Sequence, residues 1–270
     1  MVPLGVLVYL RSMSSLLQTQ IGGVAILTLN RPDKFNSFNK EMAMALQEAL
    51  DAAEHDPEVR AIILTGAGKA FCAGQDLQEA VEDNGIDITR IVSAHYNPII
   101  GRIRSIEKPV IAAVNGVAAG AGANIALACD LCIASEHAAF IQAFSKIGLI
   151  PDSGGTFFLP RLVGMQRATA LMMLGDKLMA SEAADMGMIY RSVPADNLAE
   201  EARILAERLA AMPTKALGLT KRALNKSLEQ SLGEQLALEG ELQTAASGTQ
   251  DYNEGVAAFL EKRKPEFKGA

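Results

Sequence analysis

Residues 109–134 read PVIAAVNGVAAGAGANIALACDLCIA and carry the pattern that decides the fold. The apolar run 109–114 is typical of a strand buried on both faces, residues 121–129 of a helix of small residues, and residues 131–134 of another strand. A strand, a helix and a strand in this succession indicate a β-α-β unit. The stretch therefore predicts an α/β fold.

The same alternation extends toward the N-terminus, where the sequence predicts a strand at 24–29, a helix at 41–55, a strand at 59–65 and a long helix at 88–106. From about residue 166 onward the pattern is almost entirely helical. The predicted helices there are 168–174, 181–186, 197–211, 214–230, 232–246 and 252–262. We therefore expect an α/β core over residues 16–200 and a helical C-terminal region over 201–270.

Residues 1–15 are expected to lie outside this core, as a disordered stretch or the product of an upstream start codon. The apolar run Val2 to Leu10 is too short to span a bilayer, and no basic residue precedes it. Met13-Ser14-Ser15 is a more ordinary cytosolic start. These features predict a cytoplasmic protein without a signal peptide.

Composition and charge exclude several classes of function. The chain has 270 residues, 49% of them hydrophobic, and a net charge of −6, so it has no broad attraction for nucleic acid or anionic lipid. Cys129 and Cys132 form one C-x-x-C motif without a second pair for zinc, and with Cys72 they are expected to be reduced core thiols. The three histidines have no metal-ligand spacing, so no metal site is predicted.

Two glycine-rich turns can present backbone N–H groups to a ligand. Residues 65–70 lack P-loop spacing and residues 116–122 do not complete a dinucleotide motif, so a nucleotide-phosphate site is not predicted. The turn 71–76 follows a strand, and residues 120–122 open a helix whose dipole favours negative charge. Two such donors aimed at one carbonyl form an oxyanion hole, although each loop alone is more commonly just a tight turn.

Four motifs resemble those of the enoyl-CoA hydratase/isomerase (crotonase) family in order and spacing, and the resemblance extends from about residue 16 to the C-terminus. They are Leu29-Asn-Arg-Pro32, Phe71-Cys-Ala-Gly-Gln-Asp-Leu77, Asn115-Gly-Val-Ala-Ala-Gly-Ala-Gly122 and Ile150-Pro-Asp-Ser-Gly-Gly-Thr156. The resemblance implies a crotonase-like (ClpP/crotonase) β-β-α spiral core. It also implies that the N–H groups of Gln75 and Ala121 form the oxyanion hole for a thioester carbonyl.

The catalytic positions depart from those of the family's hydratases. Where these enzymes have two glutamates, this sequence has Asn124 and Phe144, neither of which transfers protons, so two-glutamate water addition is not supported. One carboxylate, Asp152, lies in the matching segment. Taken alone it is a turn former or helix N-cap, but the resemblance implies an acid/base role. We expect Phe144, Ile147 and Leu149 to shield Asp152 and raise its pKa.

Longer matches, including Asp251-Tyr-Asn-Glu-Gly-Val-Ala-Ala-Phe-Leu-Glu-Lys-Arg263, are similar to the branch of the family that isomerises ring-1,2-epoxyphenylacetyl-CoA. The implied reactions are conversion of this epoxide to oxepin-CoA and movement of a 3-enoyl double bond into the 2-enoyl position, within phenylacetate catabolism. The aryl-CoA dehalogenases of the family place a tryptophan in the pocket, and this chain has none. The missing tryptophan argues against dehalogenation.

The resemblance also implies how coenzyme A is bound, with no cofactor beyond the CoA of the substrate. Lys34 and Phe35 would lie near the nucleotide end, and the backbone of Ala73, Gln75, Asp76 and Leu77 around the adenine and pantetheine, with Ala121 at the thioester. Phe259 and Lys262 would reach the ligand of a neighbouring subunit in a trimer or dimer of trimers. Lys34 and Lys262 can equally be solvated surface charges.

Three other functions stay open. A straight-chain enoyl-CoA isomerase of fatty-acid oxidation, or a hydratase-like enzyme of that pathway, would use the same groups in a pocket of different width. A non-catalytic acyl-CoA or RNA-associated binding protein would not need Asp152, although the acidic balance argues against RNA. Thioester hydrolysis would release free CoA thiol.

Overall fold

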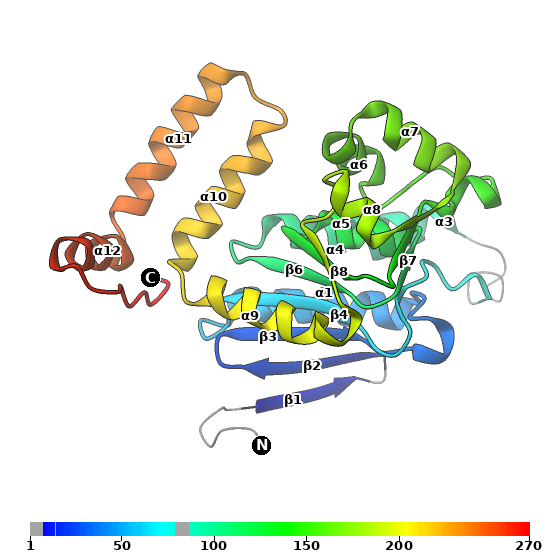
Figure 1. Cartoon of the computed structure of the whole chain (residues 1–270), viewed down its shortest axis with the longest axis horizontal. Helices are drawn as coiled ribbons and strands as arrows, with labels where there is room; N and C mark the ends of the chain where they lie inside the picture. The colour runs from blue at the N-terminus through cyan, green and yellow to red at the C-terminus, as the bar shows by residue number, and fades with distance from the viewer. Residues whose placement is uncertain (1–7, 14, 79–86) are drawn as a thin grey trace.

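The computed structural model describes residues 8–13, 15–78 and 87–270. Its larger sheet has seven strands in the order β1-β2-β3-β4-β6-β8-β11 (Figure 1). β1 to β3 pair antiparallel, and the remaining strands pair parallel. The strands are β1 (Val8–Met13), β2 (Leu16–Ile21), β3 (Val24–Leu29), β4 (Ala61–Gly66), β6 (Val110–Val114), β8 (Leu131–Ser135) and β11 (Arg191–Val193).

A second, smaller sheet runs β10-β9-β7-β5. Its strands are β5 (Ala70–Cys72), β7 (Val117–Ala119), β9 (Ala139–Ile141) and β10 (Lys177–Met179). β5, β7 and β9 each follow a strand of the larger sheet within a few residues, so successive turns of the chain add one strand to each sheet. This is the β-β-α spiral that we expected, but the short strands themselves were not predicted, because three residues are too few to show a period.

The helices in the described part of the chain surround these sheets. They are α1 (Lys40–His55), α3 (Ile88–Arg90), α4 (Asn97–Ser105), α5 (Ala121–Ala128), α6 (Gly155–Val163), α7 (Met165–Leu174), α8 (Ala180–Asp185), α9 (Leu198–Ala210), α10 (Thr214–Ser227), α11 (Leu232–Ser247) and α12 (Gln250–Glu261). Short helical turns are η1 (Pro32–Lys34), η3 (Ala143–Ile147) and η4 (Ala195–Asn197), and η2 (Ile91–Tyr96) is a π-helix that joins α3 to α4.

Strand β4 shows how the large sheet is buried on both faces. Ile62 and Leu64 pack into the main core with α1, α4 and α5, whereas Ala61 and Ile63 face a second cluster completed by α9. Side chains that alternate along a strand point to opposite faces, so both faces need cover. Full burial of a side chain such as Leu64 stabilises the fold by roughly 1.5–3 kcal/mol.

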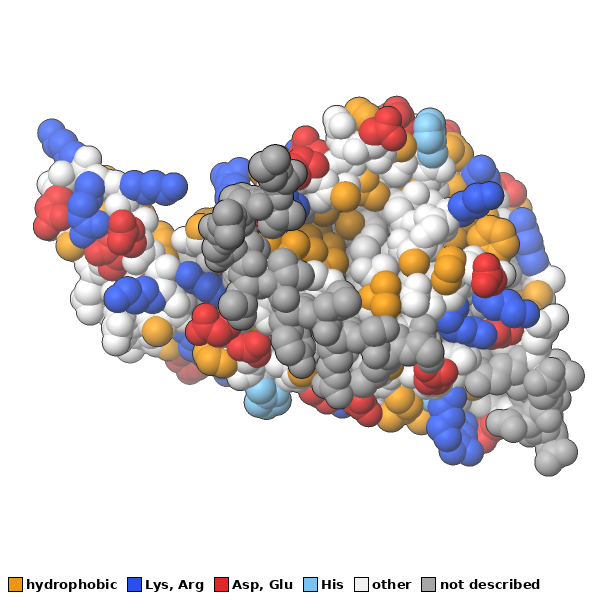
Figure 2. Space-filling model, turned by 90° about the horizontal axis from the view of Figure 1, so that it is seen from below, with side chains coloured by type: hydrophobic (Ala, Val, Ile, Leu, Met, Phe, Trp, Pro, Cys, Tyr) orange, Lys and Arg blue, Asp and Glu red, His pale blue; other side chains and the backbone are white. Residues whose placement is uncertain are grey.

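The C-terminal helices α10 to α12 stand out from the body of the molecule (Figures 1 and 2). The predicted boundary at residue 201 falls inside α9, which packs on the sheet. The middle of α10 is held to the core by Lys221, whose Nζ donates to Asp130 Oδ2 (2.8 Å) and to Ile103 O (2.6 Å). Arg60 donates to Phe267 O (2.8 Å), which ties the C-terminal tail to the core.

The N-terminal strand requires a correction. Residues 8–13 pair with β2 from Val8↔Ile21 to Met13↔Leu16, so they form an edge strand rather than a disordered stretch. Pairing gives partners to the backbone N–H and C=O groups that face β2. Residues 1–7 and 14 of the expected extension lie outside the described residues, and an upstream start codon stays a prediction. None of the described helices is long and apolar enough to cross a bilayer.

Candidate active site

The two glycine-rich turns lie against each other where β5 and β7 end. These strands pair in parallel, with Cys72 opposite Ala118, so the residues that follow them emerge at the same edge. A Cβ built on Gly74 would lie 3.1 Å from the carbonyl oxygen of Ala119 and 3.8 Å from the backbone nitrogen of Ala121. Strand pairing therefore brings Gln75 and Ala121 together although they are 46 positions apart in the sequence.

Each of these two residues has a backbone N–H group that donates to no described residue. Phe38 N–H donates to Gly74 O (2.7 Å) and Asp76 N–H donates to Phe38 O (2.8 Å), so the N–H of Gln75 between them is turned away from that bridge. Ala121 begins α5, where an N–H has no acceptor within the helix. Neither group donates to another of the residues that the structure describes. Two free donors at one edge can polarise a carbonyl oxygen.

Tyr96 anchors the first of these residues. Its hydroxyl donates to Gln75 Oε1 (2.8 Å), and its ring packs edge-on against Phe38, with centroids 5.7 Å apart. Tyr96 is buried and ends the π-helix η2, a rare conformation that is frequent at functional sites. Sequence reasoning missed Tyr96, because its role depends on a contact between distant segments.

Asp152 begins a tight turn with two left-handed residues. Ser153 (φ 52°) and Gly154 (φ 74°) both have positive φ, and Gly155 N–H donates to Asp152 O (2.9 Å), as in a type I′ turn. The conformation places the Ser153 hydroxyl on Asp152 Oδ1 (2.8 Å). The N-cap of α6 is Gly154, so Asp152 is a turn residue and not a helix cap.

Burial raises the pKa of Asp152 above its ordinary value, and the hydrogen bond from Ser153 opposes this shift in part. The predicted direction is confirmed. Of the three apolar side chains expected to shield it, Phe144 is buried, whereas Ile147 and Leu149 are 54% and 38% exposed. The shielding expected from Ile147 and Leu149 is therefore weaker than predicted, because these two side chains face solvent.

Asp152→Asn should raise the melting temperature by a few degrees near neutral pH. The pKa is raised in the folded state, so ionising Asp152 opposes folding above that pKa, and this cost disappears below the pKa of about 3.9 of an unfolded aspartate. The gain should therefore shrink as the pH falls toward about 4. Calorimetry across this range checks it, with the exposed Asp176→Asn as control. A gain that grows in acid would contradict the assigned shift.

Asn124 ties the Asp152 turn to the helix that begins with Ala121. It is fully buried on α5, and its Nδ2 donates to Asp152 O (2.8 Å). Phe144 lies near Gly120, the residue before α5, since a Cβ on Gly120 would be 3.8 Å from the Phe144 ring. The two positions at which the resemblance to hydratases would place glutamates therefore hold a buried amide and an aromatic ring.

The residues expected to bind the nucleotide and pantetheine are brought together in part. Ala73 N–H donates to Phe35 O (3.0 Å), and Lys34 Nζ donates to Gln78 Oε1 (2.7 Å), so the two loops lie side by side. Asp76 is buried and forms an ion pair with Arg31, whose guanidinium donates to Asp76 Oδ2 (2.8 Å). This ion pair fixes the loop that carries Asp76. The side chains of Phe35 and Leu77 are exposed.

Two further expected residues lie elsewhere. Phe259 is on α12 and Lys262 follows it, at the far end of the C-terminal helices from α6 and α7 (Figure 1). Within one chain they are not near Asp152.

The cysteines are free and buried, as predicted. Burial raises the pKa of the Cys72 thiol to about 12, which favours the protonated form, and the side chain packs in the main core. In the described part of the chain, no three His, Cys, Asp or Glu side chains gather in a way that would hold a metal ion.

Comparison with known proteins identifies the class that this fold and site define. Residues 19–270 match the model of the enoyl-CoA hydratase/isomerase family, and the chain belongs to that family, with its crotonase fold. The crystal structure of enoyl-CoA hydratase from Bacillus anthracis is 34% identical, with a TM-score of 0.87, and the match covers 97% of this chain and 99% of that one.

Two curated relatives are isomerases by name. The chain is 50% identical over 250 residues to 1,2-epoxyphenylacetyl-CoA isomerase of Escherichia coli (strain K12), with 92% of this chain and 95% of that protein covered. It is 38% identical to trans-2-decenoyl-[acyl-carrier-protein] isomerase of Streptococcus mutans, again with 92% and 95% covered. The predicted family and fold are confirmed.

Proposed function

We propose that the protein is an acyl-CoA isomerase with Asp152 as its acid/base group. The observation that carries this proposal is one partly buried carboxylate, its pKa raised by burial, tied through Asn124 to the helix that presents the free N–H of Ala121. Asp152 takes a proton from the carbon next to the thioester carbonyl and returns it to another carbon of the same substrate. The N–H groups of Gln75 and Ala121 hold the enolate oxygen meanwhile.

A hydratase needs a second group to activate water. Neither the Asn124 amide, which is held by Gln142 and the Asp152 backbone, nor the Phe144 ring titrates near neutral pH. One base and one oxyanion hole suffice for moving a double bond, because the proton that leaves is the proton that returns. Isomerisation is therefore favoured over water addition.

The proposed substrate is ring-1,2-epoxyphenylacetyl-CoA, converted to oxepin-CoA in phenylacetate catabolism, with a 3-enoyl to 2-enoyl shift as a second reaction. The 50% identity to a relative named for this epoxide supports the assignment. The alternative is a straight-chain enoyl isomerase, which the relative named as a trans-2-decenoyl-[acyl-carrier-protein] isomerase supports.

The test is to incubate purified protein separately with the epoxide and with a 3-enoyl-CoA, and to separate products by chromatography with mass detection. An isomer of equal mass from the epoxide supports the first assignment. Reaction of the 3-enoyl-CoA alone would make the protein a straight-chain isomerase. Release of free CoA thiol would indicate hydrolysis instead.

The proposed CoA site follows the expected residues. Lys34 and Phe35 would bind the nucleotide end, and the backbone of residues 73–77 would line the adenine and pantetheine, in keeping with the contact between these two loops. The mechanism uses only the CoA of the substrate, the Asp152 carboxylate and two backbone N–H groups of the protein. A cytoplasmic location also belongs to this proposal.

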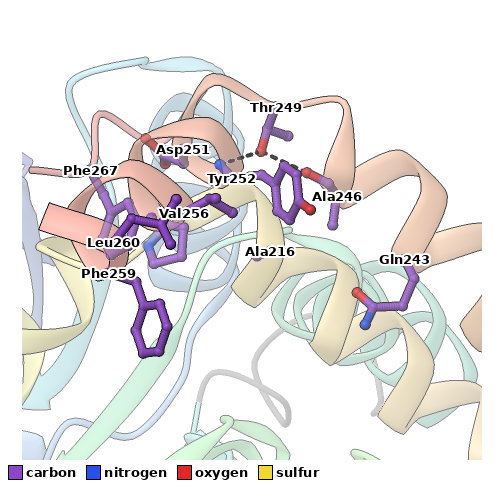
Figure 3. Close-up of a pocket in the computed structure, with 12 residues that line it drawn as sticks. Ala216, Gln243, Ala246, Thr249, Asp251, Tyr252, Val256, Phe259, Leu260 and Phe267 are labelled. Atoms are coloured by element: carbon purple, nitrogen blue, oxygen red, sulfur yellow. Dashed lines mark hydrogen bonds between the residues drawn. The ribbon is translucent and has the colours of Figure 1, made fainter. Parts of the chain in front are cut away.

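The C-terminal helices are proposed to join copies of the chain into a trimer or a dimer of trimers. A cavity of about 410 Å³ lies between these helices. Apolar side chains of α12, Phe267 of the tail and Ala216 of α10 line it (Figure 3). Phe259 and Leu260 are 82% and 74% exposed, and exposed apolar clusters of this kind usually mark contact surfaces. Another copy covering them would bring Phe259 and Lys262 to its ligand.

Phe259→Asp is expected to break this assembly, because the contact would bury an unpaired carboxylate. Light scattering after size-exclusion chromatography should give a multiple of 28.6 kDa for the wild type and a much smaller mass for the variant. Ile204→Asp, at a 48% exposed position on α9, is the control. A variant with the wild-type mass would rule out this surface.

A further inference from the structure

Gln142 and Asn124 form a chain of two buried amides that ends on the catalytic turn. Gln142 directly follows β9, next to the turn that carries the oxyanion donor, where Gly120 N–H donates to Ile141 O (2.9 Å). The Gln142 Nε2 group donates to Asn124 Oδ1 (2.8 Å), and Asn124 Nδ2 donates to the backbone oxygen of Asp152 (2.8 Å). Gln142 is 5% exposed and Asn124 is fully buried.

The direction of these hydrogen bonds is fixed by the end of the chain. The carbonyl of Asp152 can only accept, so Asn124 must present its NH₂ group to it and its oxygen to Gln142. Gln142 must then donate through Nε2. Its Oε1 is buried and has no partner among the described residues, so Asn124 is the one hydrogen-bond partner of this side chain there. Any hydrogen-bonding role of the Gln142 side chain is therefore exerted through Asn124.

The turn at the end of the chain needs this support. Ser153 has a left-handed backbone (φ 52°), which is unfavourable for a residue with a Cβ. The carbonyl of Asp152 accepts two hydrogen bonds, one from Gly155 N–H inside the turn and one from Asn124 outside it. Asn124 is thus the external hydrogen-bond donor that holds the Asp152 carbonyl in this conformation.

Close packing leaves the Asn124 amide no freedom at this point. A Cβ on Gly155 would lie 2.3 Å from its Nδ2 and 2.8 Å from its Oδ1, far inside van der Waals contact. Gly155 must therefore lack a side chain for Asn124 to reach the turn. A methyl group at residue 155 would displace the amide without removing any of its atoms.

We propose that Gln142 is a positioning residue for Asp152 and acts through Asn124. The inference rests on the proposed function, since it assigns Asp152 as the base. Gln142 orients the Asn124 amide, and the amide fixes the Asp152 carbonyl and with it the direction of the carboxylate. Asn124 is then a holder of the base and does not itself transfer protons.

The first test is Gln142→Met, which keeps the length of the side chain and removes its donor. A catalytic group displaced by about 1 Å can cost about 10²-fold in rate, so kcat should fall by about 10- to 100-fold while KM stays within about twofold. Gln235→Met is the matched control, because Gln235 also donates through Nε2 (to Ala223 O, 3.2 Å) and has a buried Oε1 with no partner among the described residues, but lies on α11. Its kcat should equal that of the wild type.

A double-mutant cycle separates positioning from general loosening of the fold. Asn124→Leu is close to isosteric and breaks both hydrogen bonds. If Gln142 acts only through Asn124, the double variant will be no slower than Asn124→Leu alone. Gly155→Ala should reproduce the defect of Gln142→Met, which keeps the test decisive if one variant fails to fold. Additive losses from Gln142→Met and Asn124→Leu would overturn the proposal.

A readout without substrate distinguishes failure of this inference from failure of the proposed function. Carboxyl ¹³C NMR of Asp152 should give a lower pKa in Gln142→Met than in the wild type, because a loosened turn exposes the carboxylate, while Gln235→Met should leave it unchanged. An unchanged titration in Gln142→Met would overturn the inference, whatever substrate the wild type accepts. Absence of isomerase activity in the wild type would instead refute the proposed function.

Discussion

Asp152→Asn is expected to lower kcat for isomerisation by about 10³-fold, because a positioned acid/base group contributes about 10²–10⁴-fold. The amide has nearly the shape of the carboxylate, and its oxygen can still accept the hydrogen bond that the Ser153 hydroxyl donates to Asp152 Oδ1. The turn should therefore stay folded. The loss would come from the missing base, and KM for the thioester should change little.

The dependence of wild-type kcat/KM on pH provides a second test of Asp152 as the base. A base must be ionised to accept a proton, so kcat/KM should fall as the pH drops through the raised pKa of Asp152. This acid limb should lie above the value of about 3.9 of an ordinary aspartate. Asp176→Asn, at an exposed position, should keep the whole profile. An acid limb retained in Asp152→Asn would show that another group is the base.

Ala121→Pro is expected to lower kcat by about 10²–10³-fold, the usual effect of losing one oxyanion-hole donor. Ala121 is the first residue of α5, a position that proline favours because the N–H there has no partner within the helix. The preceding Gly120 (φ 53°, ψ −127°) lies outside the helical region, which proline disfavours in the residue before it. The substitution thus removes one donor and leaves the helix intact.

Leu232→Pro provides the control for this prediction. Leu232 is the first residue of α11 and is 74% exposed, so the same backbone change is made far from the site. Its activity should match the wild type. If Ala121→Pro kept full activity while remaining folded, the N–H of Ala121 would have no part in stabilising the enolate.

The strands and helices with a clear period could be predicted from the sequence. The strand predicted at 24–29 coincides with β3, and the helix predicted at 88–106 is the α3, η2 and α4 run. The second sheet could not be predicted, since its strands have three residues each. Helix α6 was missed because it begins at Gly155 and contains Pro160, both of which disfavour helices when read locally.

Some residues of the candidate site could likewise be predicted from the sequence, and others could not. Gln75, Ala121 and Asp152 were predicted from motifs, since each lies in a turn rich in small residues. Tyr96 and Gln142 were not, although each has a hydrogen bond to a site residue. Their partners are 21 and 18 residues away in sequence, and only the folded chain brings them into contact. No local pattern marks such a residue.

The central claim is that one carboxylate and two backbone N–H groups isomerise an acyl-CoA thioester without adding water. The most direct test is to incubate the wild type with a 3-enoyl-CoA, and separately with ring-epoxidised phenylacetyl-CoA, in ¹⁸O-labelled water and to weigh the products by mass spectrometry. We predict a product of unchanged mass without label, formed from at least one of the two and absent with Asp152→Asn. A product heavier by one labelled water would contradict the claim, because it would require a second group that activates water.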